Sequence, residues 1–260
     1  MSAWLQGLQA RADQAPAAPR VALCAGAGES AIGSIEPALA QRMVAAGLPL
    51  VRHGEGWCVA GTALDAAFAR VAEWLRAEGL ASSWRNELLR VDDAAGSTVG
   101  LIERAAVRPL GITTHAVHLV GWAEQGGMWV QQRAFDKPTD PGQWDTLMGG
   151  LVSADESLAA TLARETWEEA GLHVDALRDV AACGRLAVRR PVSTGYMIEH
   201  VHIHEAAIPA QLVPQNQDGE VAGFELLSVD ALRERLHAGA FTLEAALILA
   251  DNLHRRGHAC

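Results

Sequence analysis

The chain is poor in several residue types, and each scarcity narrows the possibilities. It has one tyrosine and a single lysine, Lys137, so arginine supplies nearly all of its positive charge. Its four cysteines lie far apart with no C-x-x-C pair, which suits a reducing cytoplasm and argues against a zinc site. We expect most of them to be free buried thiols. They are Cys24, Cys58, Cys183 and Cys260.

Long apolar runs and a net positive charge are also absent. No stretch reaches the length of a membrane span, and the first twenty residues show no basic segment followed by an apolar core. We therefore predict no membrane association, no signal peptide and a cytoplasmic location. The formal net charge of −10 argues against nucleic acid as a partner.

The composition is otherwise that of a globular protein. Half of the 260 residues are apolar and a fifth are charged, which is enough to form a sizeable core. This length suits one large domain or two ordinary ones. Nothing in the composition predicts the oligomeric state.

Hydrophobic periodicity changes character near residue 110. Residues 62–80 have the apolar stripe of an amphipathic helix, and residues 99–112 read as a helix ending near Arg108-Pro109. Beyond Gly111, residues 114–122 and 128–134 read as strands joined by a turn. We therefore predict a boundary there, with one domain over residues 1–110 and a second over residues 111–260.

One helix is predicted within residues 153–171, where Ser153 can cap its start and Gly171 can end it. Helical spacing places Glu165, Glu168 and Glu169 on one arc beside an apolar arc. Like charges so spaced repel by roughly 0.2–0.5 kcal/mol per pair. Such an arc is either a solvated acidic face, with Arg164 beside it, or a set of hard oxygen ligands for Mg²⁺ or Mn²⁺.

The spacing around this helix favours the second interpretation. Gly150, five residues, Glu156, seven residues and then RETWEEAGL resembles the Nudix box, G-x5-E-x7-R-E-U-x-E-E-x-G-U. Thr166 is the one departure, because the family prefers a bulky aliphatic residue there. That position faces the predicted core, so the departure concerns packing more than chemistry.

The resemblance extends beyond the box. Residues 131–150 and 216–230 resemble the flanking segments of one Nudix branch, related to the Nudix domain fused to thiamine pyrophosphokinase in fungi. Residues 83–91 and 102–119 resemble that branch's N-terminal accessory domain. The resemblance implies an α/β protein, a Nudix α/β/α sandwich with a smaller N-terminal α+β accessory domain. It also implies a small-molecule diphosphate substrate, a diphosphate of thiamine or of its oxidised forms.

The resemblance further implies which residues act. Glu165, Glu168 and Glu169 would hold Mg²⁺, with Mn²⁺ as an alternative, and the Gly150 carbonyl could join them. Arg164 would orient a carboxylate. Glu156 would support the loop and helix or a further metal.

Two further roles are expected outside the box. The general base is expected to be Glu220, with Asp218 as the runner-up and Glu168 of the box as another alternative. Arg133 and Lys137 could hold the substrate phosphates, or they could be ordinary surface charges in a loop.

Other functions stay open at this point. The substrate could be a sugar nucleotide or a dinucleotide, or the chain could be a regulator that binds ligand without catalysis. The chain could also be an isomerase of the Nudix superfamily, because its R-x3-K and PG-x-WD patterns resemble those of isoprenoid diphosphate isomerases. Those enzymes have degraded boxes and a catalytic cysteine, and no cysteine lies in this loop. His200, His202 and His204 share one face of a predicted strand and could bind Zn²⁺ or phosphate. More simply, they form the polar face of a half-buried strand.

Overall fold

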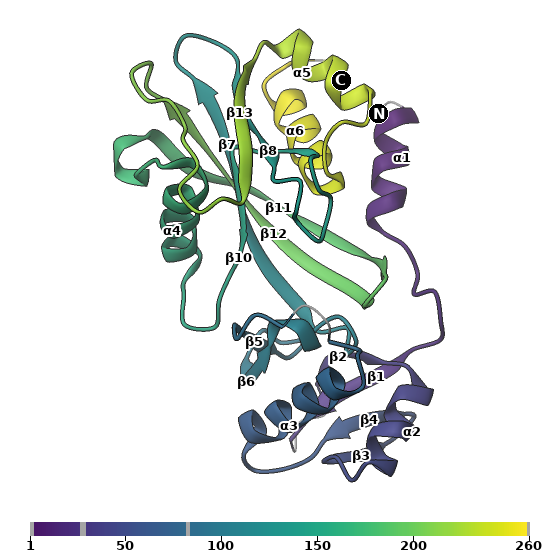
Figure 1. Ribbon diagram of the computed structural model, residues 1–260. Coiled ribbons are helices and arrows are strands. Elements are labelled where there is room, and N and C mark those ends of the chain that lie inside the picture. The colour runs from purple at the N-terminus through teal and green to yellow at the C-terminus, as the bar shows by residue number, and fades with distance from the viewer. Residues whose placement is uncertain (1–2, 27–29, 82–83, 259–260) are drawn as a thin grey trace.

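A large mixed sheet dominates the computed structural model, which describes residues 3–26, 30–81 and 84–258 (Figure 1). Its main strand order is β11-β12-β7-β8-β13, with β10 added beside β7 and β9 beside β8. The strands are β7 (Thr113–Ala123), β8 (Met128–Arg133), β9 (Trp144–Asp145), β10 (Met148–Leu151), β11 (Arg178–Val192), β12 (Gly195–Ile208) and β13 (Val221–Leu227).

Helices cover both faces of this sheet (Figure 1). On one face, α4 (Leu158–Ala170) and η2 (Val174–Ala176) cover a cluster that includes Val117, Leu147 and Leu162. On the other face lie α5 (Val229–His237) and α6 (Leu243–Arg255). The predicted α/β/α sandwich is therefore confirmed.

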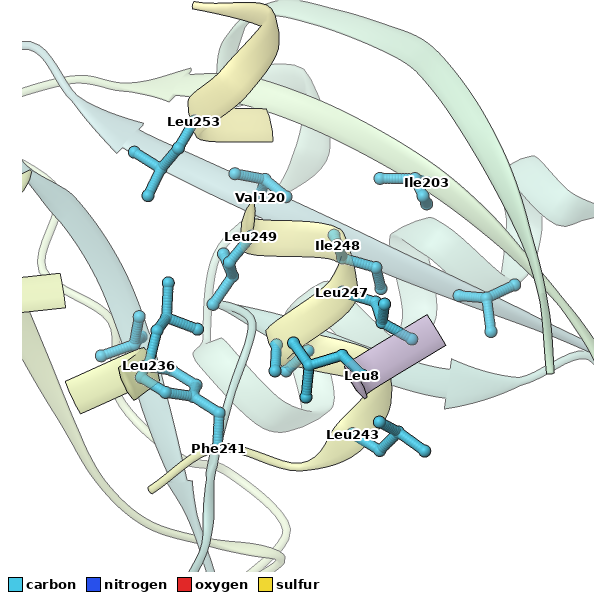
Figure 2. Packing of buried hydrophobic residues seen from close by; sticks show 14 of the residues in the cluster. Leu8, Val120, Ile203, Leu236, Phe241, Leu243, Leu247, Ile248, Leu249 and Leu253 are labelled. Atoms are coloured by element: carbon cyan, nitrogen blue, oxygen red, sulfur yellow. The ribbon is translucent and has the colours of Figure 1, made fainter. Parts of the chain in front are cut away.

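The core beneath α6 contains more buried residues than the core beneath α4, and Figure 2 shows part of it. Leu247, Ile248 and Leu249 of α6 are buried there with Val120 of β7 and Ile203 of β12. Each such side chain contributes about 1.5–3 kcal/mol when fully buried. This burial fixes the sheet on which the site is built.

The N-terminal region, residues 21–112, has a hydrophobic cluster of its own around Phe68, Met43 and Leu75. A four-stranded sheet of order β2-β1-β4-β3 lies in it, with a separate pair of strands, β5 and β6. Its elements are β1 (Val21–Ala25), β2 (Ala31–Ile35), α2 (Pro37–Ala45), β3 (Leu50–His53), β4 (Gly56–Val59), α3 (Leu64–Ala77), β5 (Leu88–Asp92), β6 (Thr98–Glu103) and η1 (Arg104–Ala106).

The first helix lies apart from this region. Helix α1 (Ala3–Ala12) packs against α6, and Leu8 and Ala12 join the core beneath α6. Just beyond it, Asp13 pairs with Arg189 of β11. A boundary near residue 110 stays a prediction, and these contacts show that the chain's first turns pack on its C-terminal part.

Two predicted elements differ in the structure. Residues 99–112 do not form the predicted helix beyond the single turn of η1, because residues 98–103 pair with β5 and place Ile102 opposite buried Leu89. The box helix begins later than predicted, at Leu158, since the Ser157 hydroxyl accepts the capping hydrogen bond from the Ala160 N–H at 3.1 Å. Ser153 lies in the preceding turn instead.

The structure also bears on the cysteines and on the length of the apolar helices. Cys24 and Cys58 are buried, Cys183 is half-buried, and all three are free thiols. Cys260 lies outside the described residues. Within those residues, no helix combines the length and apolar character that a membrane crossing needs.

Candidate active site

Helix α4 places its acidic side chains at the edge of the core. Leu162, Thr166 and Ala170 point into the core, and Gly171 ends the helix in the left-handed conformation at φ 63°. The Thr166 hydroxyl, at the position where the box departs from its pattern, donates to the Leu162 carbonyl at 2.6 Å. A polar side chain is thus accommodated in the core without an unpaired donor.

Glu165 lies directly over Gly150 of β10. A Cβ atom built at residue 150 would stand 2.1 Å from the Glu165 carboxyl carbon, so a side chain there would displace the carboxylate. Burial raises the pKa of Glu165 to about 7. The glycine of the motif is therefore a requirement of close packing against an acid.

Glu169 is more deeply buried, at 2% exposure. Its Oε2 accepts hydrogen bonds from the Gln131 side-chain amide at 2.8 Å and from the Gly149 N–H at 3.0 Å. Burial, and then the charge of Glu165, raise its pKa to about 8. Two carboxyl groups one helical turn apart thus sit where a neighbouring positive charge would stabilise their ionised forms.

Arg164 gathers the remaining acids of the motif. Its Nε and Nη2 donate to the two carboxylate oxygens of Glu156 at 2.7 and 2.9 Å. Its Nη1 donates to Glu165 at 2.9 Å and to Glu168 at 2.8 Å. The side chain of Glu168 is 41% exposed and paired with Arg164, so it is not grouped with the buried pair.

Lys137 lies between the buried pair and Glu220. Its Nζ forms an ion pair with Glu220 and lies 3.9 Å from Oε1 of Glu169. Burial acts to raise the pKa of Glu220, but the hydrogen bond and charge of Lys137 outweigh it and lower that pKa. Asp218 accepts a hydrogen bond from the Glu220 N–H at 2.8 Å and so shapes the turn.

Arg133 fixes the loop that carries Lys137. Its guanidinium donates to the Thr139 carbonyl at 3.0 Å and lies 3.4 Å from Asp145. The Ala134 N–H donates a hydrogen bond to the carbonyl of Glu220, the residue before β13, and so joins the same loop to the start of that strand. The two predicted phosphate ligands therefore come from one short, braced segment.

One cleft of about 200 Å³ is lined by Arg133, Lys137, Glu165, Glu169 and Glu220, whereas Glu156, Arg164 and Glu168 are not among its lining residues. Its acidic side chains are Asp140, Asp145, Glu165, Glu169, Glu199, Glu220 and Glu244. Its basic side chains are Arg85, Arg104, Arg108, Arg133, Lys137 and Arg190. The sequence did not predict the roles of Gln131, Arg104, Arg108, Arg190 or Glu244, because no local motif distinguishes them and only long-range packing brings them here.

The histidine face of β12 forms a separate cluster. His202 Nε2 lies 3.1 Å from Nδ1 of His115 on β7, and Asp92 of β5 lies 3.5 Å from His115. Burial lowers the pKa of His202 to about 4, and the pKa values of His200 and His204 are lowered for the same reason. These imidazoles are therefore neutral at pH 7.

Metal binding can be tested against the donor set. No three His, Cys, Asp or Glu side chains among the described residues converge closely enough to hold a metal ion, the histidine cluster included. The Glu165 and Glu169 pair nonetheless suits Mg²⁺, which is bound in proteins by one or two carboxylates together with waters and substrate phosphates. Glu168 could join only after leaving Arg164.

The fold and the cleft together define an α/β/α protein. In it, a pair of buried carboxyl groups faces Gly149 and Gly150 of β10, and arginine and lysine side chains line the same cleft. Residues 113–247, just over half of the chain, match the family described as NUDIX domain. The chain therefore belongs to the Nudix family.

Individual relatives of the chain carry two different activities in their names. Nudix hydrolase 20, chloroplastic, of Arabidopsis thaliana is 30% identical over 196 residues, covering 74% of this chain and 52% of the relative. Isopentenyl-diphosphate Delta-isomerase of Streptomyces coelicolor is 31% identical over 151 residues, covering 57% of this chain and 74% of the relative. The chain spans about half the length of the plant Nudix hydrolases it matches.

A solved structure shares the fold. DR0079 of Deinococcus radiodurans superimposes with a TM-score of 0.50 at 24% identity, covering 62% of this chain and 97% of that protein. At this identity the likeness concerns the fold alone.

Proposed function

We propose that this protein is a Mg²⁺-dependent diphosphohydrolase that cleaves a phosphoric anhydride bond of a small molecule. The observation that carries the proposal is the pair of buried carboxyl groups, Glu165 and Glu169, with pKa values raised to about 7 and about 8. They line a cleft that also holds Lys137. A bound cation would stabilise the ionised form of these two buried carboxyl groups. The same cation would neutralise the charge of a phosphate bound in the cleft.

Glu165 and Glu169 would hold the metal, with Glu168 and the Gly150 carbonyl as further ligands. When bound, Mg²⁺ supplies charge neutralisation for the phosphate oxygens and a more acidic water. Mn²⁺ has similar ligand preferences and is the alternative. Arg164 would then keep Glu156 and the start of α4 in place, because its fork spans both oxygens of Glu156.

Glu220 is the proposed general base. Lys137 keeps it ionised, since the pKa of Glu220 is lowered, and an ionised carboxylate can accept a proton from the attacking water. Lys137 would also bind a phosphate oxygen, because it lines the cleft beside Glu169. Arg133 would act chiefly by holding the loop of Lys137.

For the substrate, we propose a thiamine-diphosphate-like compound, including oxidised forms of thiamine. Support comes from residues 131–150 and 216–230, which resemble the thiamine-linked branch. The alternative substrates are a sugar nucleotide and a dinucleotide. The alternative function is that of a regulator that binds its ligand without catalysis. A hydrolysis screen over thiamine diphosphate, its oxidised analogues, nucleotide sugars, dinucleotides and nucleoside triphosphates, with and without Mg²⁺, separates them. Products are resolved by chromatography, because cleavage of a nucleotide sugar or a dinucleotide gives two phosphate monoesters and no free phosphate. Hydrolysis of no compound would contradict the proposed activity.

An isomerase of isopentenyl diphosphate is the second candidate, favoured by the match to the Streptomyces enzyme. The part of the cleft that the structure describes has no cysteine among its lining residues, which counts against it. Adding isopentenyl diphosphate to the screen tests it. Rearrangement of the double bond without phosphate release would favour the isomerase.

A further inference from the structure

Three arginines of the N-terminal region reach the cleft of the box helix. Arg85, Arg104 and Arg108 line the same cleft as Glu165 and Glu169. The same three arginines also line an adjoining hollow, whose apolar walls include Val107, Ile112 and Met197. The three arginines therefore lie at the junction between the charged cleft and the partly apolar hollow.

The backbone at Arg108 is held firmly in place. Its carbonyl accepts hydrogen bonds from the Gly111 N–H at 3.2 Å and from the Tyr196 N–H at 3.0 Å, so β12 is tied to it directly. A Cβ atom at Gly195 would lie 2.3 Å from the same carbonyl oxygen. Arg20 donates to the Pro109 carbonyl at 2.7 Å. The arginine is thus presented from a fixed position, as a ligand-binding group requires.

The guanidinium of Arg108 has charged neighbours but no bonded partner. Among the described residues it makes no hydrogen bond and no ion pair, although it is half-buried and its burial lowers its pKa. The charges of Glu199 and Glu244 favour its ionised form, and those of Arg104 and Arg190 oppose it. A half-buried guanidinium with free donors is costly unless an acceptor completes it.

The neighbouring acids are already engaged elsewhere. Glu199 accepts a hydrogen bond from the Thr114 hydroxyl at 3.1 Å. Glu244 lies 3.6 Å from Arg190, and Nε of Arg190 is buried with no partner among the described residues. Nε of Arg190 is thus a buried donor without a partner, and the half-buried guanidinium of Arg108 has no acceptor among the described residues.

We propose that Arg108, with Arg104 and Arg190 beside it, binds the diphosphate of the substrate from the N-terminal region's side of the cleft. This inference rests on the proposed function, because it places the same diphosphate that Glu165 and Glu169 would face. Guanidinium donors match phosphate oxygens in pairs, which makes arginine a strong phosphate ligand. The organic part of the substrate then extends into the hollow beside Val107, Ile112 and Met197. The N-terminal region is accordingly part of the binding site.

Methylenediphosphonate, in which a CH₂ group replaces the bridging oxygen and prevents hydrolysis, is the probe. Its dissociation constant is measured by calorimetry on the full chain, once with EDTA and once with Mg²⁺. Arg108→Met removes the guanidinium, and Arg108→Gln provides a second variant if the first does not fold. Arg70→Met is the matched control, since it makes the same charge change at an exposed residue of α3. Among the residues that the structure describes, the Arg70 side chain donates only to the Gly47 carbonyl.

We expect Arg108→Met to weaken binding about tenfold or more in both buffers, because the lost bonds do not depend on the metal. We expect Arg70→Met to bind as the unaltered chain does. Equal affinities for Arg108→Met and Arg70→Met, or no binding by the unaltered chain in either buffer, would overturn the inference.

The two proposals fail separately. If no compound is hydrolysed but diphosphonate binding still depends on Arg108, the phosphate-binding role stands and the proposed reaction does not. If hydrolysis is measured but neither KM nor diphosphonate affinity responds to Arg108→Met, the reaction stands and the arginine's role does not.

Discussion

Replacing Gly150 by alanine should separate the position of Glu165 from the stability of the fold. The new Cβ would stand 2.1 Å from Cδ and 2.2 Å from Oε1 of Glu165. Ordinary contact begins near 3.4 Å, so the carboxylate must move by about 1 Å or more. The atoms in conflict belong to the end of a flexible side chain, and that chain can turn aside without moving the backbone.

We therefore expect a small loss of stability, about 1 kcal/mol, and a large loss of turnover, about a hundredfold, since misplacement by about 1 Å in a site has that effect. Chemical unfolding gives the first quantity and phosphate release at saturating Mg²⁺ gives the second. Gly223→Ala in β13 is the matched control, because a Cβ there meets no atom within 4 Å. It should leave both quantities unchanged.

A double-mutant cycle tests the cause. In a Glu165→Ala background the obstructing carboxylate is gone, so Gly150→Ala should lose most of its stability cost. The reasoning is refuted if Gly150→Ala keeps normal turnover, or if its stability cost is the same with and without the Glu165 side chain.

The remaining predictions concern the charges of the cleft. Glu165→Gln and Glu169→Gln should each lower kcat by orders of magnitude yet leave the metal-free protein no less stable, because each relieves repulsion between buried acids; near-normal turnover at saturating Mg²⁺ would contradict the metal assignment. Burial raises the pKa of Glu244 to about 7 from an ordinary 4.5, so its contribution to stability is full below pH 4.5 and is lost as the pH rises through 7. Relative to the Glu244→Gln variant, urea unfolding should show the unaltered chain losing about 3 kcal/mol between these limits; parallel pH profiles would exclude the assignment. Arg164→Ala should lower the free energy of unfolding by about 1–3 kcal/mol, because this group is partly exposed. Arg164→Lys should not restore that loss, because a lysine cannot span both oxygens of Glu156. Equal thermal stability of the lysine variant and the unaltered chain would show that charge alone suffices.

The sequence predicted much of the C-terminal architecture because its signals are local. Periodicity placed β7 and β8, and the C-terminal stop at Gly171 follows from the ability of glycine to adopt a positive φ. The prediction was wrong for residues 99–112, where pairing with β5 decided the outcome. Short apolar segments have no helix or strand preference strong enough to override such a partner.

Helical spacing alone determined that Glu165, Glu168 and Glu169 share an arc, and it could go no further. The contact of Arg164 with Glu168 is an i,i+4 pair within the helix, whereas only the tertiary structure decided that Gln131 and Gly149 hold Glu169 in the core. The same is true of Arg108, which nothing in its neighbours along the chain distinguishes. Spacing fixes which side chains share one face of an element, but the groups that meet that face come from distant segments. The positions of these distant groups depend on how the cores of the N-terminal region and of the large sheet pack.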